Sequence, residues 1–340
     1  MSKVVTFGEI MVRLAPSGYL KILQADNFDV NYTGAEANIC VSLSQFGMDN
    51  EFVTKLPDNE ITKCAKNMLR KYGVGINHIK LGGDRIGLYY LERGASQRPS
   101  KIVYDRKYSS ISLSSREDYD WDEIFKNATW FHFTGITAGL SDNMPQICED
   151  ACIAAKKAGV IISCDLNYRK ALWSKEKAQK VMTNLMKYVD VVIGNEEDAS
   201  TTLGISPSKT NVYEGKLNYD SYIDVAKEIC DKFNTKKVAF TLRTSKSASD
   251  NTWAAMLYDG GKAYFSKSYD IHMVDRVGGG DSFSAGLIYA LESKFDNQKA
   301  IEFATAASCL KQTMEYDFNL STVDEVYNLM NGDGSGRVQR

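Results

Sequence analysis

Short runs of β-branched and aromatic residues alternate along this 340-residue chain with longer amphipathic stretches. Such alternation is typical of βαβ units, in which parallel strands form one sheet and the helices between them cover its faces. The pattern therefore predicts an α/β fold with a mostly parallel central sheet. Strands are expected at residues 4–7, 52–55, 130–133, 160–164, 189–193 and 237–241, and helices are expected to begin near Ala35, Asn59, Asp142, Ser174, Glu196 and Tyr219.

Two stretches break the alternation, at about residues 9–33 and 86–112. In the second stretch, Gly87-Leu-Tyr-Tyr-Leu-Glu and Lys101-Ile-Val-Tyr-Asp-Arg are typical of paired strands joined by a polar turn. No helix in either stretch would cover a sheet face. We therefore expect a small β-rich flap over the mouth of the main sheet, with strands that also suit an oligomer contact.

The C-terminal third departs from the βαβ pattern in another way. Residues 252–269 favour a hairpin that turns at Asp259-Gly-Gly. Helices are then expected at residues 281–292, 298–314 and 322–330. Residues 331–340 are rich in glycine and polar residues and are expected to form a frayed tail, which leaves residues 1–330 as the folded unit.

Composition narrows the classes of partner and compartment. The formal net charge is -2, from 41 basic and 43 acidic residues, so no overall positive field exists to hold nucleic acid or an anionic membrane. No apolar run resembles a signal peptide or a membrane span, and the seven cysteines are scattered, which together indicate a cytoplasmic protein. With three histidines, a histidine-rich metal centre is not expected. The chemistry should lie with carboxylates, amides and glycines.

One glycine-rich segment stands out, Asp275-Arg-Val-Gly-Gly-Gly-Asp281, between the hairpin and a helical pattern. Three successive glycines at a helix start can turn backbone N–H groups toward an anion, and the helix dipole adds positive charge there. Asp281 can then act as a base near an acceptor hydroxyl, as phosphoryl transfer requires, or it can simply cap the helix.

The common nucleotide-binding fingerprints are absent. The chain has no Gly-x-x-x-x-Gly-Lys-Ser/Thr motif, and no Gly-x-Gly-x-x-Gly follows its first strand. Protein-kinase signatures are missing as well, since Asp317-Phe-Asn is the nearest match to their activation-segment triplet. P-loop, Rossmann and protein-kinase interpretations therefore lose support.

Residues 275–281 resemble the Asp-Thr-x-Gly-Ala-Gly-Asp signature of ribokinase-like (PfkB) sugar kinases, and Thr33-Gly-Ala-Glu-Ala-Asn38 resembles their N-terminal Gly-Gly-x-x-x-Asn motif. The resemblance extends from Val4 to about Met330. It implies a ribokinase-like three-layer α/β/α kinase domain over residues 1–330, with inserted lid strands at about 9–33 and 86–112. It also implies that ATP and Mg²⁺ are used and that Asp281 is the catalytic base.

Within the family, Gly34-Ala-Glu-Ala-Asn, the Tyr104/Arg106 pair, Asp165-Leu-Asn-Tyr-Arg-Lys-Ala-Leu-Trp and Asp317-Phe-Asn look most like the 2-keto-3-deoxygluconate kinases. This likeness implies phosphorylation of the 6-hydroxyl of that sugar acid. Guanidinium groups would hold the substrate carboxylate, which a neutral sugar lacks. The residues implied for the sugar-acid pocket are Gly34, Ala35, Glu36, Asn38, Tyr89, Tyr104, Arg106, Ile136, Asn167, Arg169 and Asp317.

For the nucleotide, Asn195-Glu-Glu-Asp198 resembles the family's Asn-x-x-Glu motif, which is associated with magnesium and phosphate. The shorter Asp198 favours a metal contact through water, although these acidic residues equally suit a helix first turn. Arg243 stands where relatives carry a glycine-rich turn, and it is the candidate phosphate contact there. The resemblance further implies an ATP and anion site made of Asn195, Arg243, Gly278, Gly279 and Gly280, with Arg276 in place of the signature threonine.

Three alternatives remain open at this stage. A sibling kinase of a neutral sugar such as fructose or ribose is the nearest, and the pocket arginines discriminate against it. A non-catalytic sugar or nucleotide sensor and a dehydrogenase are further alternatives. The expected partners are a small sugar acid, ATP and further copies of the chain, in a homodimer or higher homo-oligomer.

Overall fold

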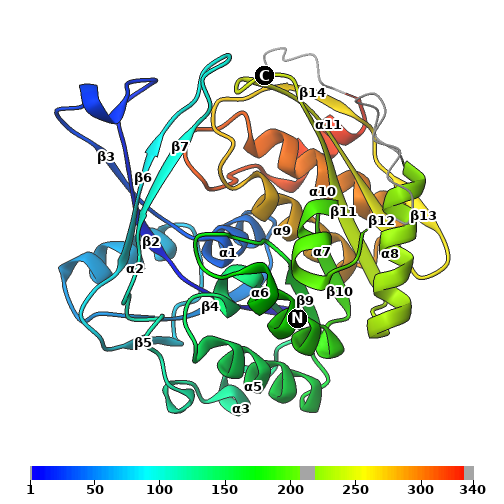
Figure 1. The fold of residues 1–340 in the computed structure, drawn as a ribbon, viewed down its shortest axis with the longest axis horizontal. Coiled ribbons are helices and arrows are strands. Elements are labelled where there is room, and N and C mark those ends of the chain that lie inside the picture. Colours follow the sequence, from blue (N-terminus) through cyan, green and yellow to red (C-terminus); the bar gives the residue numbers. More distant parts are fainter. Residues whose placement is uncertain (1, 207–218, 333–340) are drawn as a thin grey trace.

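A computed structural model describes residues 2–206 and 219–332, and it contains a large sheet and a smaller one (Figure 1). The described strands of the large sheet follow the order β13-β12-β11-β10-β9-β8-β1-β4-β5, and β14 pairs with the first half of β12. Their bounds are β1 (Lys3–Phe7), β4 (Asp49–Leu56), β5 (Ile79–Leu81), β8 (Trp130–Thr134), β9 (Ile161–Asp165), β10 (Val191–Gly194), β11 (Lys237–Ser245), β12 (Asp250–Tyr258), β13 (Ala263–Phe265) and β14 (Tyr269–His272).

The strands from β5 to β11 are all parallel, and only β12 to β14 run antiparallel to their neighbours. Parallel strands bury both faces, and β8 illustrates this with Phe131 and Phe133 on one face and Trp130 on the other. The predicted α/β class with a mostly parallel sheet is therefore confirmed.

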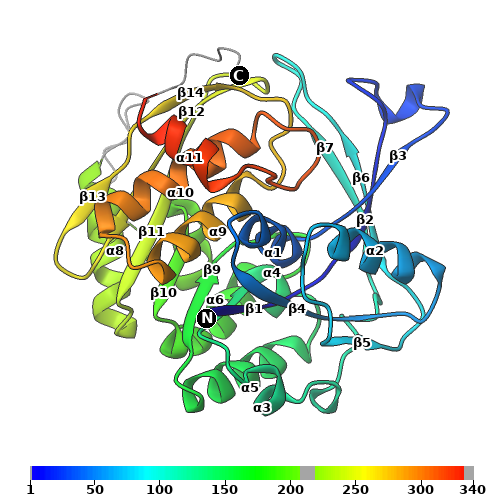
Figure 2. The ribbon, with the colours of Figure 1, turned by 180° about the vertical axis from the view of Figure 1, so that it is seen from behind.

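Helices cover both faces of the large sheet, as the two opposite views show (Figures 1 and 2). Helices α3 to α8 pack on one face, whereas α1, α2 and α9 to α11 pack on the other. Their bounds are α1 (Ala35–Gln45), α2 (Glu60–Lys71), α3 (Trp121–Ile124), α4 (Gly135–Ala138), α5 (Met144–Lys157), α6 (Lys175–Leu185), α7 (Glu196–Leu203), α8 (Tyr219–Phe233), α9 (Gly279–Glu292), α10 (Asn297–Lys311) and α11 (Val323–Met330), with short 3-10 turns at Ile22–Gln24, Arg116–Asp118 and Met186–Tyr188.

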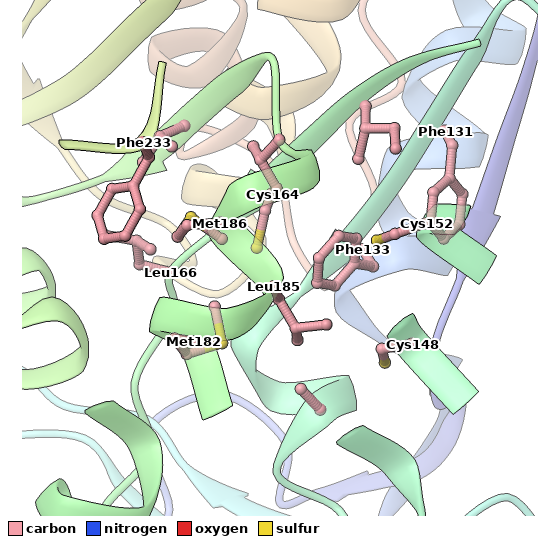
Figure 3. Packing of buried hydrophobic residues seen from close by; sticks show 14 of the residues in the cluster. Phe131, Phe133, Cys148, Cys152, Cys164, Leu166, Met182, Leu185, Met186 and Phe233 are labelled. Atoms are coloured by element: carbon pink, nitrogen blue, oxygen red, sulfur yellow. The ribbon is translucent and has the colours of Figure 1, made fainter. Parts of the chain in front are cut away.

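The core under α5, α6 and α8 is rich in aromatic and sulfur-containing side chains (Figure 3). The polarizable sulfur atoms fill gaps between rings, and the buried cysteines are free thiols. The side chains labelled in this view are Phe131, Phe133, Cys148, Cys152, Cys164, Leu166, Met182, Leu185, Met186 and Phe233.

Local signals in the sequence explain where several helices begin. Asn59, Ser174 and Asp296 each accept a hydrogen bond from a backbone N–H of the first turn that follows. Several predicted boundaries were wrong by a few residues. The helix expected to reach Met314 ends at Lys311, and β11 continues to Ser245 because its second half pairs with β12.

The smaller sheet has the order β3-β2-β6-β7 and stands beside the large sheet at one end (Figure 1). Its strands are β2 (Met11–Ala15), β3 (Asp29–Thr33), β6 (Gly87–Glu92) and β7 (Lys101–Asp105), which fall within the two stretches where the sequence pattern breaks. We call this sheet the lid sheet. Most of the expected tail, residues 333–340, lies outside the described residues, and no helix in the described part of the chain is long and apolar enough to span a bilayer.

Candidate active site

A cleft of about 700 Å³ lies between the lid sheet and the carboxyl ends of the parallel strands. Open α/β sheets bind ligands at this edge, because loops from several strands converge there. The structure brings every residue named from the sequence to this one cleft. These residues are Gly34, Ala35, Glu36, Asn38, Tyr89, Tyr104, Arg106, Ile136, Asn167, Arg169, Asn195, Asp198, Arg243, Gly278, Gly279, Gly280, Asp281 and Asp317.

The glycine-rich turn forms the first turn of α9. Gly278 is the N-cap residue with φ +83°, a conformation that favours glycine, and a Cβ there would also collide with the backbone of Asp317. The backbone N–H groups of Gly280 and Asp281 find no backbone acceptor among residues 2–206 and 219–332. The turn therefore offers free donors at a helix N-terminus, as an anion site requires.

Asp281 does not cap its helix. It is the third residue of α9, and its Oδ2 accepts a hydrogen bond of 2.7 Å from Nδ2 of Asn38. Oδ1 of Asn38 accepts from the backbone N–H of Gly34 at 3.4 Å, which fixes the amide orientation, and it lies 2.7 Å from the Thr33 hydroxyl. The carboxylate is thus held by α1 and points into the cleft from the α9 side.

Burial raises the pKa of Asp281 to about 6, and the nearby Asp317 carboxylate adds to the rise, whereas Asn38 and the cations Arg169 and Lys311 oppose it. At pH 7 the group is still mostly ionised. A carboxylate whose pKa lies near the working pH is suited to act as a general base.

Glu36 lies beneath the cleft with its side chain turned into the protein. It is 1% exposed, and its Oε1 accepts from both the backbone and the hydroxyl of Thr134 and from the hydroxyl of Thr137. Burial raises its pKa to about 7, although these hydrogen bonds oppose the shift. The carboxylate therefore joins α1 to β8 and α4, while its helix turn lines the cleft.

Asp317 is buried between the lid sheet and the glycine turn. One carboxylate oxygen accepts from Arg13 of β2, and the other accepts from Thr33 at 2.8 Å and from the hydroxyl of Tyr89 at 2.7 Å. Arg13 is fully buried and also donates to Asp275 at 2.5 Å. This ion-pair cluster joins the lid sheet to the start of the glycine-rich segment at Asp275 and to the loop after α10 that contains Asp317.

Arg106 faces the cleft but already has an anionic partner. Its guanidinium pairs with the buried carboxylate of Glu9, which also accepts from Ser109 at 2.6 Å. The ring of Tyr104 lies 5.3 Å from the guanidinium carbon, in cation–π contact. The positive charge that Arg106 offers to a ligand is therefore partly neutralised by Glu9.

Arg169 contrasts with Arg106, since it is exposed at the rim of the cleft and no described carboxylate pairs with it. Its Nη1 donates to the backbone oxygen of Tyr168 at 2.9 Å. Its charge opposes the rise that burial causes in the pKa values of Asp165, Asp198 and Asp281. Arg169 therefore lies close to the acidic residues of the cleft.

The half of the cleft for which the sequence predicts the nucleotide begins at α7. Asn195 is the N-cap of this helix and accepts from the backbone N–H of Asp198 at 2.8 Å, so the helix-first-turn interpretation of the acidic run is realised. Asp198 accepts from the backbone N–H of Tyr168 at 3.1 Å. Burial raises the pKa of Asp165 well above its usual value, and repulsion from Asp198 adds to this rise.

These oxygen donors suit a hard cation such as Mg²⁺, and a divalent ion would relieve the repulsion between the two carboxylates. No group of three or more metal-ligating side chains is assembled in the described part of the chain. These residues therefore suit a metal ion that keeps most of its water ligands. They do not form a site in which protein side chains supply most of the ligands.

Two arginines line the same half of the cleft. Arg243 lies on β11 rather than in a turn and is exposed, and half-buried Arg276 precedes the glycines. Burial lowers the pKa of Arg276, and repulsion from Arg243 contributes to the shift. Two neighbouring cations without a paired carboxylate in the described residues are typical of a phosphate site.

Sequence reasoning missed several residues of this region. Asp165 was quoted as the first residue of the Asp-Leu-Asn-Tyr-Arg motif but was given no role, although its position at the end of β9 could have identified it. Arg13, Glu9 and Lys311 carried no local signal, because each is defined by partners far away in the chain.

Comparison with known proteins agrees with this architecture. The family model described as pfkB family carbohydrate kinase matches residues 1–317. A crystal structure of 2-dehydro-3-deoxygluconokinase from Thermotoga maritima superimposes with a TM-score of 0.94 at 52% identity, over 97% of this chain and 98% of that one. Haloferax volcanii 2-dehydro-3-deoxygalactonokinase is 28% identical over 98% of each chain, and Thermoproteus tenax 2-dehydro-3-deoxygluconokinase is 25% identical over 91% of this chain and 88% of its own. The chain belongs to the pfkB family of carbohydrate kinases.

Proposed function

We propose that the protein transfers the γ-phosphoryl group of ATP to the 6-hydroxyl of 2-keto-3-deoxygluconate, giving 2-keto-3-deoxy-6-phosphogluconate and ADP. The observation that carries the proposal is the position of Asp281. Its carboxylate is fixed by Asn38, has a pKa of about 6, and adjoins a glycine turn with free N–H donors. A base next to an anion site is what phosphoryl transfer to a hydroxyl needs.

In this mechanism the acceptor hydroxyl lies between Asp281 and the glycine turn. The hydroxyl oxygen attacks the γ-phosphorus, and Asp281 takes its proton as the new O–P bond forms. The bond from that phosphorus to the β-γ bridging oxygen breaks, and ADP leaves with the electron pair. The N–H groups of Gly280 and Asp281 would stabilise the charge that develops on the transferred group.

The nucleotide would occupy the half of the cleft that contains Arg243 and Arg276, whose charges favour its phosphates. Asp165, Asp198 and Asn195 would hold Mg²⁺ through water molecules. When bound with ATP, the metal supplies positive charge to the phosphate oxygens. Exclusion of water from the cleft would fall to the lid sheet, through Tyr89 and Tyr104.

A sugar acid is supported by Arg169, an exposed guanidinium at the cleft without a described carboxylate partner, and by the activities named for the relatives. The 2-keto-3-deoxygalactonate epimer is a further candidate substrate, since the Haloferax relative is named for it. A neutral sugar such as fructose remains the alternative acceptor. The pairing of Arg106 with Glu9 favours this alternative, because it leaves less positive charge available to an acceptor carboxylate.

A coupled assay for ADP release with purified protein, ATP and Mg²⁺ tests the assignment. The two keto-deoxy acids, fructose and ribose are compared at equal concentrations. We expect kcat/KM for 2-keto-3-deoxygluconate to exceed that for fructose by at least about 100-fold, because a neutral acceptor leaves the Arg169 guanidinium without an anionic partner. Higher activity on fructose or ribose would reject the sugar-acid proposal while leaving the kinase proposal intact.

We also propose a homo-oligomer that forms through the lid sheet and its connections. Leu23, Val30 and Val103 are 96%, 56% and 54% exposed, and apolar patches of this kind suit a contact between identical subunits. Light scattering should give at least twice the mass of 37.9 kDa. Val103→Glu should lower that mass, and a monomeric wild-type protein would refute the proposal.

A further inference from the structure

Lys311, the last residue of α10, is a lysine with no solvent exposure. Its Nζ donates a hydrogen bond of 3.0 Å to the backbone oxygen of Asp275, the residue that opens the glycine-rich segment. Lysine is almost never fully buried unless its charge has a use or a partner. The phosphoryl-transfer mechanism proposed above assigns this ammonium no part.

The end of α10 supports the glycine turn at three points. Besides Lys311, the hydroxyl of Ser308 donates to the backbone oxygen of Gly279 at 2.7 Å. The backbone oxygen of Gln312 accepts from Val274 at 2.9 Å. The segment is therefore held near its start and at Gly279, and of these three contacts the one from Lys311 carries a charge.

The surroundings of Lys311 are strongly charged. Asp275 and Asp317 are both buried, Arg13 donates hydrogen bonds to both of them, and Arg93 lies 3.8 Å from Asp275. The Lys311 charge also reaches the base, since it lowers the pKa of Asp281. Burial lowers the pKa of Lys311 itself, while Asp275, Asp317 and Asp281 act in the opposite direction.

We propose that Lys311 is a positioning residue whose ammonium acts as a built-in cation beneath the anion site, fixing the Asp275 carbonyl and thereby the glycine turn. A carbonyl oxygen beside two carboxylates is a place where a free monovalent cation would otherwise bind, since hard cations prefer oxygen ligands. The tethered ammonium makes such an ion unnecessary. This inference rests on the proposed kinase function and adds an electrostatic component to it.

A purely structural role for Lys311 has different consequences. If the lysine only balances buried carboxylates, its loss lowers stability and leaves turnover per folded molecule unchanged. If it positions the turn, its loss lowers kcat with little change in KM, because the turn acts on the charge that develops during transfer.

Three variants separate the two roles. Lys311→Met keeps the length of the side chain without the charge, Lys311→Ala leaves a cavity, and Lys227→Met on the exposed face of α8 is the matched control. We expect kcat of Lys311→Met to fall about 100-fold, the loss typical of one anion-hole contact, with both KM values within about threefold. Methylammonium should restore kcat of Lys311→Ala at least about fivefold by filling the cavity, and should not restore Lys311→Met, which has none.

The wild-type protein provides an independent measurement that does not depend on how the variants fold. Its kcat should agree within about twofold in sodium, potassium and tetramethylammonium chloride at equal ionic strength, because the built-in charge replaces a free ion. A tenfold requirement for potassium, or a kcat of Lys311→Met within about threefold of wild type, would overturn the inference. Failure of the wild-type protein to phosphorylate any sugar or sugar acid would instead reject the proposed function.

Discussion

Replacing Asp281 with asparagine should abolish most phosphoryl transfer and at the same time stabilise the folded protein at neutral pH. The substitution keeps the acceptor oxygen that Asn38 needs and removes only the charge and the basicity. Loss of a general base typically lowers kcat by about 10²- to 10⁴-fold. In the wild-type protein, kcat should fall about tenfold per pH unit below about pH 6, the pKa of this carboxyl.

The gain in stability follows from the direction of the pKa shift. The folded pKa of about 6 lies above the usual value of 3.8, so between about pH 4 and pH 6 the folded state binds more protons than the unfolded state. The free energy of unfolding therefore decreases as the pH rises through this window, and the loss is complete above pH 6. A shift of about two pKa units corresponds to about 3 kcal/mol, and partial hydration in the cleft reduces the expected gain to about 1–3 kcal/mol.

Urea unfolding of the wild type and Asp281→Asn at pH 8 and pH 5 measures this difference, together with steady-state kinetics. The control is Asp324→Asn, an exposed carboxylate in the first turn of α11. The stability gain should be largest at pH 8 and about half as large at pH 5. A variant that retains near wild-type kcat, or that is less stable than wild type at pH 8, would refute the assignment of Asp281 as a desolvated base.

Three further substitutions test the acceptor, lid and nucleotide regions. Arg169→Ala should raise KM for the sugar acid about tenfold and leave KM for ATP unchanged, and Arg70→Ala, at an exposed position, is the control. If steady-state assays gave the same KM for the sugar acid in Arg169→Ala and wild type, a contact with the substrate carboxylate would be excluded. Arg13→Met leaves Asp275 and Asp317 without their shared cation, so urea unfolding should show that the free energy of unfolding falls by about 3–5 kcal/mol. Arg13→Lys should recover part of this loss, and a loss below about 1 kcal/mol would contradict the role of the buried ion pairs. Arg243→Ala should raise KM for ATP about tenfold at constant KM for the sugar acid, and the reverse pattern in the same assay would move Arg243 to the acceptor side.

Much of the fold was predictable from local patterns. Alternating strands and helices, the break in pattern at the lid strands, and capping residues such as Ser174 depend on periodicities of a few residues. The wrong boundary of β11 has a non-local cause. The second half of this strand is extended because it pairs with β12, which follows later in the chain. Pairing between strands competes with local turn propensity, and a single sequence does not reveal which one wins.

The residues of the candidate site were also named from motifs, but their present partners were not. From the sequence, Arg106 and Arg169 were both predicted to bind the carboxylate of the substrate. The structure separates them, because Arg106 is paired with Glu9 and Arg169 has no such partner in the described chain. Likewise Asn195 acts as a helix cap, a role that the motif left open.

By itself the sequence determined the α/β class, the position of the lid strands, and Asp281 at a glycine-rich helix start. Those features depend on short-range periodicity and on the conformational freedom of glycine. Tertiary structure alone decided that Arg13 and Lys311 meet Asp275 from opposite ends of the chain. Burial and charge pairing over such separations determine the pKa of Asp281 and the rigidity of its turn, and they exist only once the chain has folded.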